Sequence, residues 1–189
     1  MAVEIELKFT VDDLPALEVK LRALGFRLDT PRTFESNTLY DTPERTLRAR
    51  KQILRIRQYG ETWTLTHKAA PPNTDDSLYK TRIETETAIA DGEALAQVFV
   101  TLGYQPVFRY EKFRSEWSDP ATGHHLVLDE TPIGIYAELE GDPAWIDAML
   151  AALEVPAGHR TTESYGKLFL NWKELTQSPA ENLTFDAIK

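Results

Sequence analysis

Hydrophobic and polar positions alternate along the first residues of the chain, which is the period of a β-strand. Val3, Ile5, Leu7 and Phe9 are apolar, and the residues between them are charged. Successive side chains of a strand point to opposite faces of a sheet. The start of the chain is therefore predicted to form a strand with one apolar face and one charged face.

The same period of two returns in seven further segments, which are residues 33–40, 54–58, 61–68, 78–87, 107–117, 124–129 and 135–140. Tyr59 and Gly60 mark a tight turn between two of these segments. The chain is therefore predicted to contain about eight strands, most of them joined as hairpins.

Apolar residues at a spacing of about 3.6 predict helices between the strands. The predicted helices cover residues 14–24, 91–102, 143–153 and 164–175. Asp12 and Asp91 are placed to cap the first two, and Gly25 and Gly103 are placed to end them. Pro43 indicates a further short turn or helix. The alternation of periods predicts a mixed α+β chain.

The predicted domain organisation is a single domain over residues 1–175, followed by a weakly ordered tail over residues 176–189. Neither a linker nor an internal repeat divides the sequence. Residues 69–76 (AAPPNTDD) are rich in proline and predict a mobile loop.

Composition excludes several classes of function. The 189 residues contain no cysteine, which excludes disulfides, thiolate metal sites and a cysteine nucleophile. The net charge of −9 argues against a uniform nucleic-acid-binding surface. No apolar run approaches the roughly 20 residues of a membrane span, and the N-terminal segment is acidic where an export signal is basic. We therefore expect a cytoplasmic protein that binds neither nucleic acid nor membrane.

The charged faces of the predicted strands suggest a binding site. They carry carboxylate pairs in some strands and cations in others: Glu4, Glu6, Lys8, Arg55, Arg57, Lys68, Arg82, Lys112, Arg114, Glu138 and Glu140. One interpretation is that each face simply points to water. If the strands instead close into a barrel, the faces enclose a solvated channel, because so many charges cannot be buried dry. Such a channel suits a phosphate chain together with a divalent cation.

These residues resemble the CYTH family, also called triphosphate tunnel metalloenzymes. The hallmark of that family is Glu-x-Glu-x-Lys near the N-terminus, which is Glu4 to Lys8 here. Further matches follow in order: Tyr40-Asp41-Thr42, Leu54-Arg55-Ile56-Arg57, Lys68, Arg82-Ile83-Glu84, Glu111-Lys112-Phe113-Arg114, Asp129, Glu138-Leu139-Glu140 and Ser164-Tyr165 with Leu168. The resemblance covers residues 2–172.

The resemblance implies a closed eight-stranded antiparallel β-barrel tunnel with helices packed outside, and it implies the roles of its residues. The implied substrate-binding residues are Lys8, Arg55, Arg57, Lys68, Arg82, Lys112 and Arg114. The implied ligands of Mg²⁺ or Mn²⁺ are Glu4, Glu6, Asp129, Glu138 and Glu140. Lys8, Tyr40 and Lys68 are the candidate catalytic residues. Glu84 and Glu86 are expected to contact the metal or to pair with arginines, whereas Arg109 has the wrong parity to face inward.

The implied reaction is cleavage of a triphosphate, as a hydrolase or as a lyase. The substrate would be inorganic triphosphate, thiamine triphosphate or ATP, and the protein a triphosphatase or a class IV adenylate cyclase acting as monomer or homodimer. Any of Trp63, Tyr79, Tyr110 and Tyr136 could stack on an organic ring, although packing in the barrel wall is the commoner role of aromatics. The alternative function is a non-catalytic module that binds a nucleotide or polyphosphate.

Overall fold

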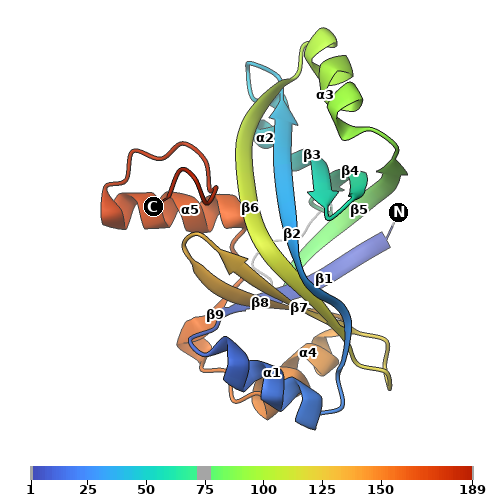
Figure 1. Ribbon diagram of the computed structural model, residues 1–189, viewed down its shortest axis with the longest axis vertical. Helices are drawn as coiled ribbons and strands as arrows, with labels where there is room; N and C mark the ends of the chain where they lie inside the picture. The colour runs from blue at the N-terminus through green and yellow to red at the C-terminus, as the bar shows by residue number, and fades with distance from the viewer. Residues whose placement is uncertain (1, 72–77, 189) are drawn as a thin grey trace.

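The computed structural model describes residues 2–71 and 78–188, and in these ranges eight antiparallel strands close into a barrel (Figure 1). The strands are β1 (Ala2–Thr10), β2 (Arg27–Asp41), β3 (Gln52–Tyr59), β4 (Thr62–Ala69), β5 (Lys80–Ile89), β6 (Gln105–Ser118), β7 (His125–Thr131) and β8 (Gly134–Glu140). Their order is β5-β4-β3-β2-β6-β7-β8-β1, and β1 pairs back to β5. The predicted α+β fold with a closed eight-stranded barrel is confirmed.

The helices pack outside this barrel, as predicted (Figure 1). They are α1 (Leu14–Ala23), α2 (Thr46–Ala49), α3 (Gly92–Thr101), α4 (Pro143–Ala152) and α5 (Tyr165–Thr176). A short 3-10 turn (Ala157–His159) and the two-residue strand β9 (Arg160–Thr161), which pairs with β1, were not predicted. Asp91 caps α3 as expected, whereas Asp13 and not Asp12 caps α1.

The apolar core lies between the barrel wall and the helices. Leu7 of β1, Leu128 of β7 and Leu139 of β8 face outward and are buried beneath α1 and α4, which contribute Leu21 and Ile146. A second apolar cluster joins β3 and β4 to α3. Because the hydrophobic faces of the strands point outward, the charged faces line the inside.

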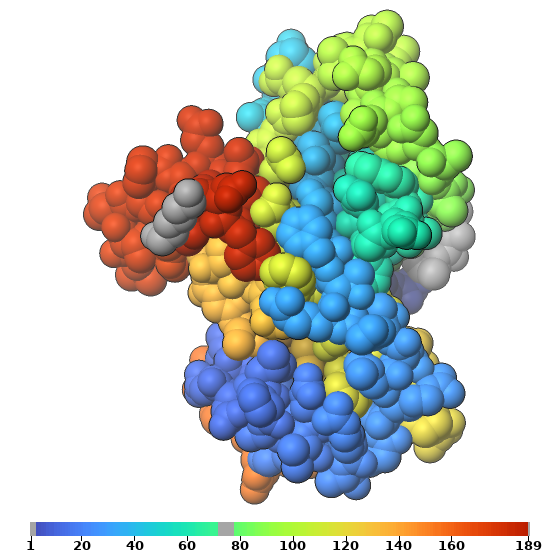
Figure 2. Space-filling view, viewed as in Figure 1, coloured from blue at the N-terminus to red at the C-terminus, as the bar shows by residue number. Residues whose placement is uncertain are grey.

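The C-terminal segment is ordered against the barrel, which corrects the prediction of a weakly ordered tail. Backbone hydrogen bonds join Leu183 to Arg109 (3.0 Å) and to Glu111 (2.8 Å) of β6. The edge of β6 is open there because β7 pairs with β6 only from Phe113 onward. Leu183 is fully buried, and Figure 2 shows the C-terminal residues in red against β6. The division of the chain into a domain over residues 1–175 and a segment over residues 176–189 stays a prediction.

Most of the predicted proline-rich loop lies beyond the residues that the structure describes. Residues 72–76 of the predicted loop lie outside the described residues, and residues 69–71 extend from the end of β4.

No helix in the described ranges is long and apolar enough to cross a membrane. The cytoplasmic location, the lack of nucleic-acid binding and the monomeric or dimeric state stay predictions.

Candidate active site

A cavity of about 710 Å³ lies inside the barrel, and side chains from all eight strands, most of them polar or charged, surround it. Its wall includes ten of the predicted residues: Glu4, Glu6, Lys8, Arg55, Arg57, Lys68, Lys112, Arg114, Glu138 and Glu140. These residues come from β1, β3, β4, β6 and β8 and converge on one space. Strand parity therefore places these ten predicted side chains on the inner face of the barrel.

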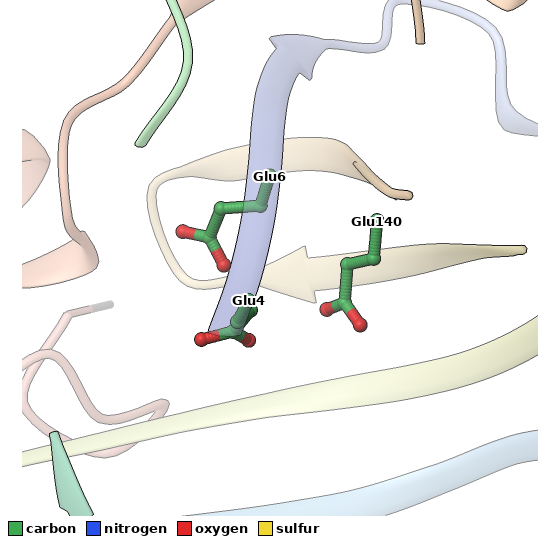
Figure 3. Close-up of side chains that lie close together, drawn as sticks. All are labelled: Glu4, Glu6 and Glu140. Carbon is green, nitrogen blue, oxygen red and sulfur yellow. The ribbon is translucent and has the colours of Figure 1, made fainter. Parts of the chain in front are cut away.

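Three carboxylates form a cluster at one part of this wall. Glu4 and Glu6 project from β1, and Glu140 projects from the end of β8 (Figure 3). One oxygen of each lies within 4.8 Å of an oxygen of the others. Glu6 is paired in register with Glu140 across the β1–β8 ladder, which places the two side chains next to each other. Clustered carboxylate oxygens are the ligands that Mg²⁺ and Mn²⁺ prefer, so these residues could hold a divalent cation.

The three carboxylates differ in how their negative charge is balanced. Glu4 accepts hydrogen bonds from Lys68, with Nζ–Oε distances of 3.0 and 2.7 Å, and Glu6 forms an ion pair with Lys80. Glu140 has no ion pair or hydrogen bond within the described part of the chain. Burial raises the pKa of Glu140 to about 7 despite the charge of Arg114, and the neighbouring carboxylates add to the rise. An ionised Glu140 therefore lacks a compensating charge, which a bound metal ion would supply.

Asp129 belongs to a different cluster, a buried network of ion pairs. Its carboxylate accepts hydrogen bonds from Arg114 Nε (2.7 Å) and Nη2 (2.6 Å) and from Lys112 Nζ (2.9 Å). The hydroxyl of Tyr165, at the start of α5, donates a further bond of 2.6 Å. Asp129 is fully buried and lies outside the carboxylate cluster. Its oxygens are thus occupied by cations of the protein itself.

Glu138 lies in the same network. It forms an ion pair with Lys8, and it accepts a hydrogen bond of 2.9 Å from Arg114 Nη2. Burial alone would raise the pKa of Glu138, but Lys8, Arg114 and Lys112 hold it well below its usual range. Glu138 is therefore an ionised partner of the cations, whereas Glu140, two residues later, is not.

Two arginines of β3 form another part of the wall. Arg55 donates to the Tyr110 hydroxyl and to Thr66 Oγ1, each at 3.1 Å. Arg57 donates to Thr64 Oγ1 at 3.1 Å, and its Nη2 lies 3.3 Å from Glu86. Both guanidinium groups are thus held on the inner face, where their planar forks match phosphate oxygens.

Comparison with known proteins agrees with this geometry. The sequence profile of the CYTH domain matches residues 2–146. The chain belongs to the CYTH family. A relative from Methanocaldococcus jannaschii, named as a candidate adenylate cyclase, is 29% identical over 138 residues, which cover 73% of this chain and 76% of the relative.

Solved structures share the CYTH fold of this chain. A candidate adenylate cyclase of Vibrio parahaemolyticus superposes with a TM-score of 0.74 and 21% identity, over 88% of this chain and 97% of that one. The PH1819 protein of Pyrococcus horikoshii superposes with a TM-score of 0.72 and 24% identity, over 89% and 99%.

Two residues of the predicted CYTH site, Tyr40 and Arg82, lie outside the cavity wall. Tyr40 faces away from the cavity and packs edge-on against Phe99 of α3, with ring centroids 5.2 Å apart. Arg82 lies opposite Glu4 in register, but its guanidinium donates to the Thr81 carbonyl, and the residue is not part of the cavity wall.

Asp129 and Glu138 are also predicted metal ligands, and in this structure both are paired with cations of the protein. Their role as ligands stays a prediction. The described carboxylates that cluster are thus only Glu4, Glu6 and Glu140.

The Tyr-Asp-Thr motif has a structural role in this CYTH chain. The carboxylate of Asp41 accepts hydrogen bonds from the backbone amides of Thr42 (2.7 Å), Leu47 (2.9 Å) and Arg48 (3.0 Å). These bonds hold the start of α2 against the end of β2. The motif therefore anchors a turn outside the cavity.

Sequence reasoning missed Glu35, Lys80 and Tyr165 as parts of the CYTH site. Glu35 is fully buried, and its Oε1 lies 3.3 Å from the ammonium of Lys112. Lys80 has the parity of Arg82 and lies two residues earlier, so strand alternation could have found it. Glu35 shares a parity with Asn37, opposite to that of the aromatic Phe34, and the same signal was available there. Tyr165 lies on a helix, where strand parity gives no indication.

Glu35→Gln is expected to destabilise the protein by up to about 3 kcal/mol at neutral pH. Burial alone would raise the pKa of Glu35, but Lys112, Arg114, Arg55 and Arg57 lower it from 4.5 to about 2. A carboxylate whose pKa is lower in the folded state stabilises the protein above the unfolded pKa of 4.5. This contribution is lost as the pH falls toward 2.

Urea unfolding of the wild type and of Glu35→Gln between pH 3 and pH 7 tests this expectation. The difference in the free energy of unfolding should shrink steadily below pH 4.5. A difference that stays constant over this range contradicts the assigned charge of Glu35.

Proposed function

We propose that the protein is a Mg²⁺- or Mn²⁺-dependent enzyme that holds a triphosphate in the barrel cavity and cleaves it. With water as the nucleophile, it would be a triphosphatase that releases a diphosphate and phosphate. With the ribose 3′-hydroxyl of ATP as the nucleophile, it would be a class IV adenylate cyclase that releases cyclic AMP and pyrophosphate. The two reactions require the same charged wall.

The charge balance of the cavity wall carries the proposal. Among the described residues, seven lysines and arginines and eight aspartates and glutamates line the cavity. A triphosphate alone would meet an excess of negative charge in this space. A divalent cation on Glu4, Glu6 and Glu140 removes that excess and leaves the basic residues to bind phosphate oxygens. A module that only bound polyphosphate would bind it better without the carboxylate cluster.

The basic residues have distinct roles in this proposal. Arg55 and Arg57 are held rigidly by Thr66 and Thr64, so they fix the phosphate chain in one orientation. Lys8 and Lys68 lie beside the carboxylates and stabilise charge that develops on the bridging oxygen as it leaves. The metal ion, when bound, supplies Lewis-acid polarisation of a phosphoryl oxygen.

A substrate panel tests the proposal. Inorganic triphosphate, thiamine triphosphate and ATP are each incubated with Mg²⁺ and with Mn²⁺, and phosphate release and cyclic AMP are measured side by side. We expect metal-dependent cleavage of at least one substrate. The relative from Methanocaldococcus jannaschii, named as a candidate adenylate cyclase, supports including the cyclase measurement. Tight binding of all three compounds without cleavage of any would favour the non-catalytic module instead.

Arg57→Ala is expected to weaken binding of inorganic triphosphate by about 10- to 100-fold, and binding of diphosphate by less. The reason is that a triphosphate bound at the metal site is long enough to contact Arg57 as well. A diphosphate can bind the metal site without that contact. Calorimetric titration in the presence of Mn²⁺ measures both affinities.

Arg109→Ala is the matched control, because the Arg109 side chain is 54% exposed on the outer face of β6. Equal losses for the two ligands in Arg57→Ala would contradict the placement of the chain along the arginines.

A further inference from the structure

Lys80 is a basic residue of the cavity wall to which the proposed reaction assigns no role. It is the first residue of β5, directly opposite Glu6 in the β1–β5 register. Its ammonium forms an ion pair with the Glu6 carboxylate, and its side chain is 18% exposed to the cavity that it lines. Glu6 therefore has Lys80 on one neighbouring strand and Glu140 on the other.

Lys68 makes a similar contact but is held differently. Its ammonium bonds to Glu4 and also lies 3.2 Å from Glu84, a carboxylate outside the Glu4–Glu6–Glu140 cluster. Loss of the contact with Glu4 would leave Lys68 anchored by Glu84. Lys80, in contrast, has Glu6 as its sole ion-pair partner within the described residues. Of the two lysines that form ion pairs with the cluster, Lys80 is the one that can leave it.

The ammonium of Lys80 therefore contacts the Glu6 carboxylate, which a metal ion at the cluster would also need as a ligand. A metal ion bound to Glu6 competes with the Lys80 ammonium for the same oxygens. The two positive charges also repel each other, and the low dielectric of the site strengthens that repulsion. The long flexible side chain of lysine allows its charge to move by several ångströms without a change in the backbone. Lys80 lines the same continuous cavity as Arg55 and Arg57, so an ammonium released from Glu6 enters the space assigned to the phosphate chain.

We propose that Lys80 is an exchangeable cation that pairs with Glu6 in the metal-free protein and binds a phosphate oxygen of the substrate once Glu6 takes up a divalent ion. This inference rests on the proposed function and adds a residue to it. Lys80 lowers metal affinity in the empty cavity and raises substrate affinity in the metal-loaded one. Metal and triphosphate therefore bind cooperatively, and the coupling is reciprocal, as linkage requires.

A purely structural role predicts different behaviour. If Lys80 only clamps β5 to β1 through Glu6, then its removal lowers stability and leaves the coupling between metal and phosphate binding unchanged. The two roles are thus separated by binding measurements that do not depend on turnover.

The experiment measures Mn²⁺ binding from the electron paramagnetic resonance signal of the free ion. Wild type and Lys80→Gln are titrated alone and with saturating diimidotriphosphate, an analogue of inorganic triphosphate with NH in place of both bridging oxygens. Without the analogue, Lys80→Gln should bind Mn²⁺ about tenfold more tightly than wild type. The analogue should strengthen Mn²⁺ binding in wild type, and this enhancement should be at least about fivefold smaller in the variant.

Lys20→Gln is the matched control, because Lys20 forms an ion pair of 2.8 Å with Glu154 on the outer surface. It should behave as wild type in both titrations. Lys80→Met, which keeps most of the apolar stem, replaces the glutamine variant if the latter does not fold. Unchanged or weaker Mn²⁺ binding in the Lys80 variants, or an unchanged enhancement by the analogue, overturns the inference. If wild type itself binds no Mn²⁺, the proposed function fails, and the inference fails with it.

Discussion

Glu140→Gln is expected to reduce turnover by about a thousandfold or more while the protein stays folded. The Glu140 carboxylate has no cationic partner in the described residues, and it lies within 4.8 Å of two other carboxylates. A neutral amide of the same size therefore removes repulsion and breaks no ion pair. The variant loses one of the three proposed carboxylate ligands, so the loss should appear as weaker metal binding together with lower activity.

The measurement combines turnover of the best triphosphate at saturating Mg²⁺ with thermal unfolding. The melting temperature of Glu140→Gln should equal or exceed that of the wild type. Glu130→Gln is the control, because Glu130 pairs with Arg32 on β2 (2.6 Å) and does not line the cavity. Turnover of Glu140→Gln equal to that of the wild type would remove Glu140 from the metal site.

The alternation of side chains between the two faces of each strand, or strand parity, determines how much of the site was predictable from the sequence. Alternation with apolar neighbours assigned Glu4, Glu6 and Lys8 to one face of β1, and all three line the cavity. It also assigned Arg109 to the outer face, where its side chain is half exposed. Parity is a local property of the chain, so the sequence carries it directly.

The partner of each inward residue was not predictable, because it depends on the register between strands. Glu138 and Glu140 have the same parity on β8, yet Glu138 lies opposite Lys8, whereas Glu140 lies opposite Glu6. One is therefore neutralised by an ammonium group, and the other adds to a cluster of carboxylates. Register between strands distant in sequence is fixed by the closure of the whole barrel and leaves no mark within either segment.

Motif matching misled the prediction where a motif carries both an inward and an outward residue. The resemblance of its motif to that of the family predicts a catalytic role for Tyr40, but Leu39 beside it is the residue that lines the cavity. The alternation of β2 places Tyr40 with Phe34 and not with Glu35 or Asn37. Parity and motif disagreed at this position, and the structure follows parity.

Asp129→Asn is expected to lower the free energy of unfolding by about 3–5 kcal/mol, in contrast to the neutral effect on stability expected for Glu140→Gln. Asp129 is fully buried and balances two cations, Lys112 and Arg114, while Tyr165 ties it to α5. An amide of the same shape accepts fewer of these bonds and leaves buried positive charge uncompensated. Urea unfolding of both variants measures the contrast.

The same variant decides whether Asp129 belongs with the metal ligands or with the ion-pair network. Asp147→Asn is the control, because Asp147 accepts a similar tyrosine bond of 2.6 Å from Tyr79 but is exposed. It should change stability far less than Asp129→Asn does. The opposite outcome has two parts: the free energy of unfolding of Asp129→Asn lies within about 1 kcal/mol of that of the wild type, and the variant loses Mn²⁺ affinity as Glu140→Gln does. Asp129 is then a metal ligand. Its bonds to Arg114 and Lys112 would then be contacts that metal binding replaces.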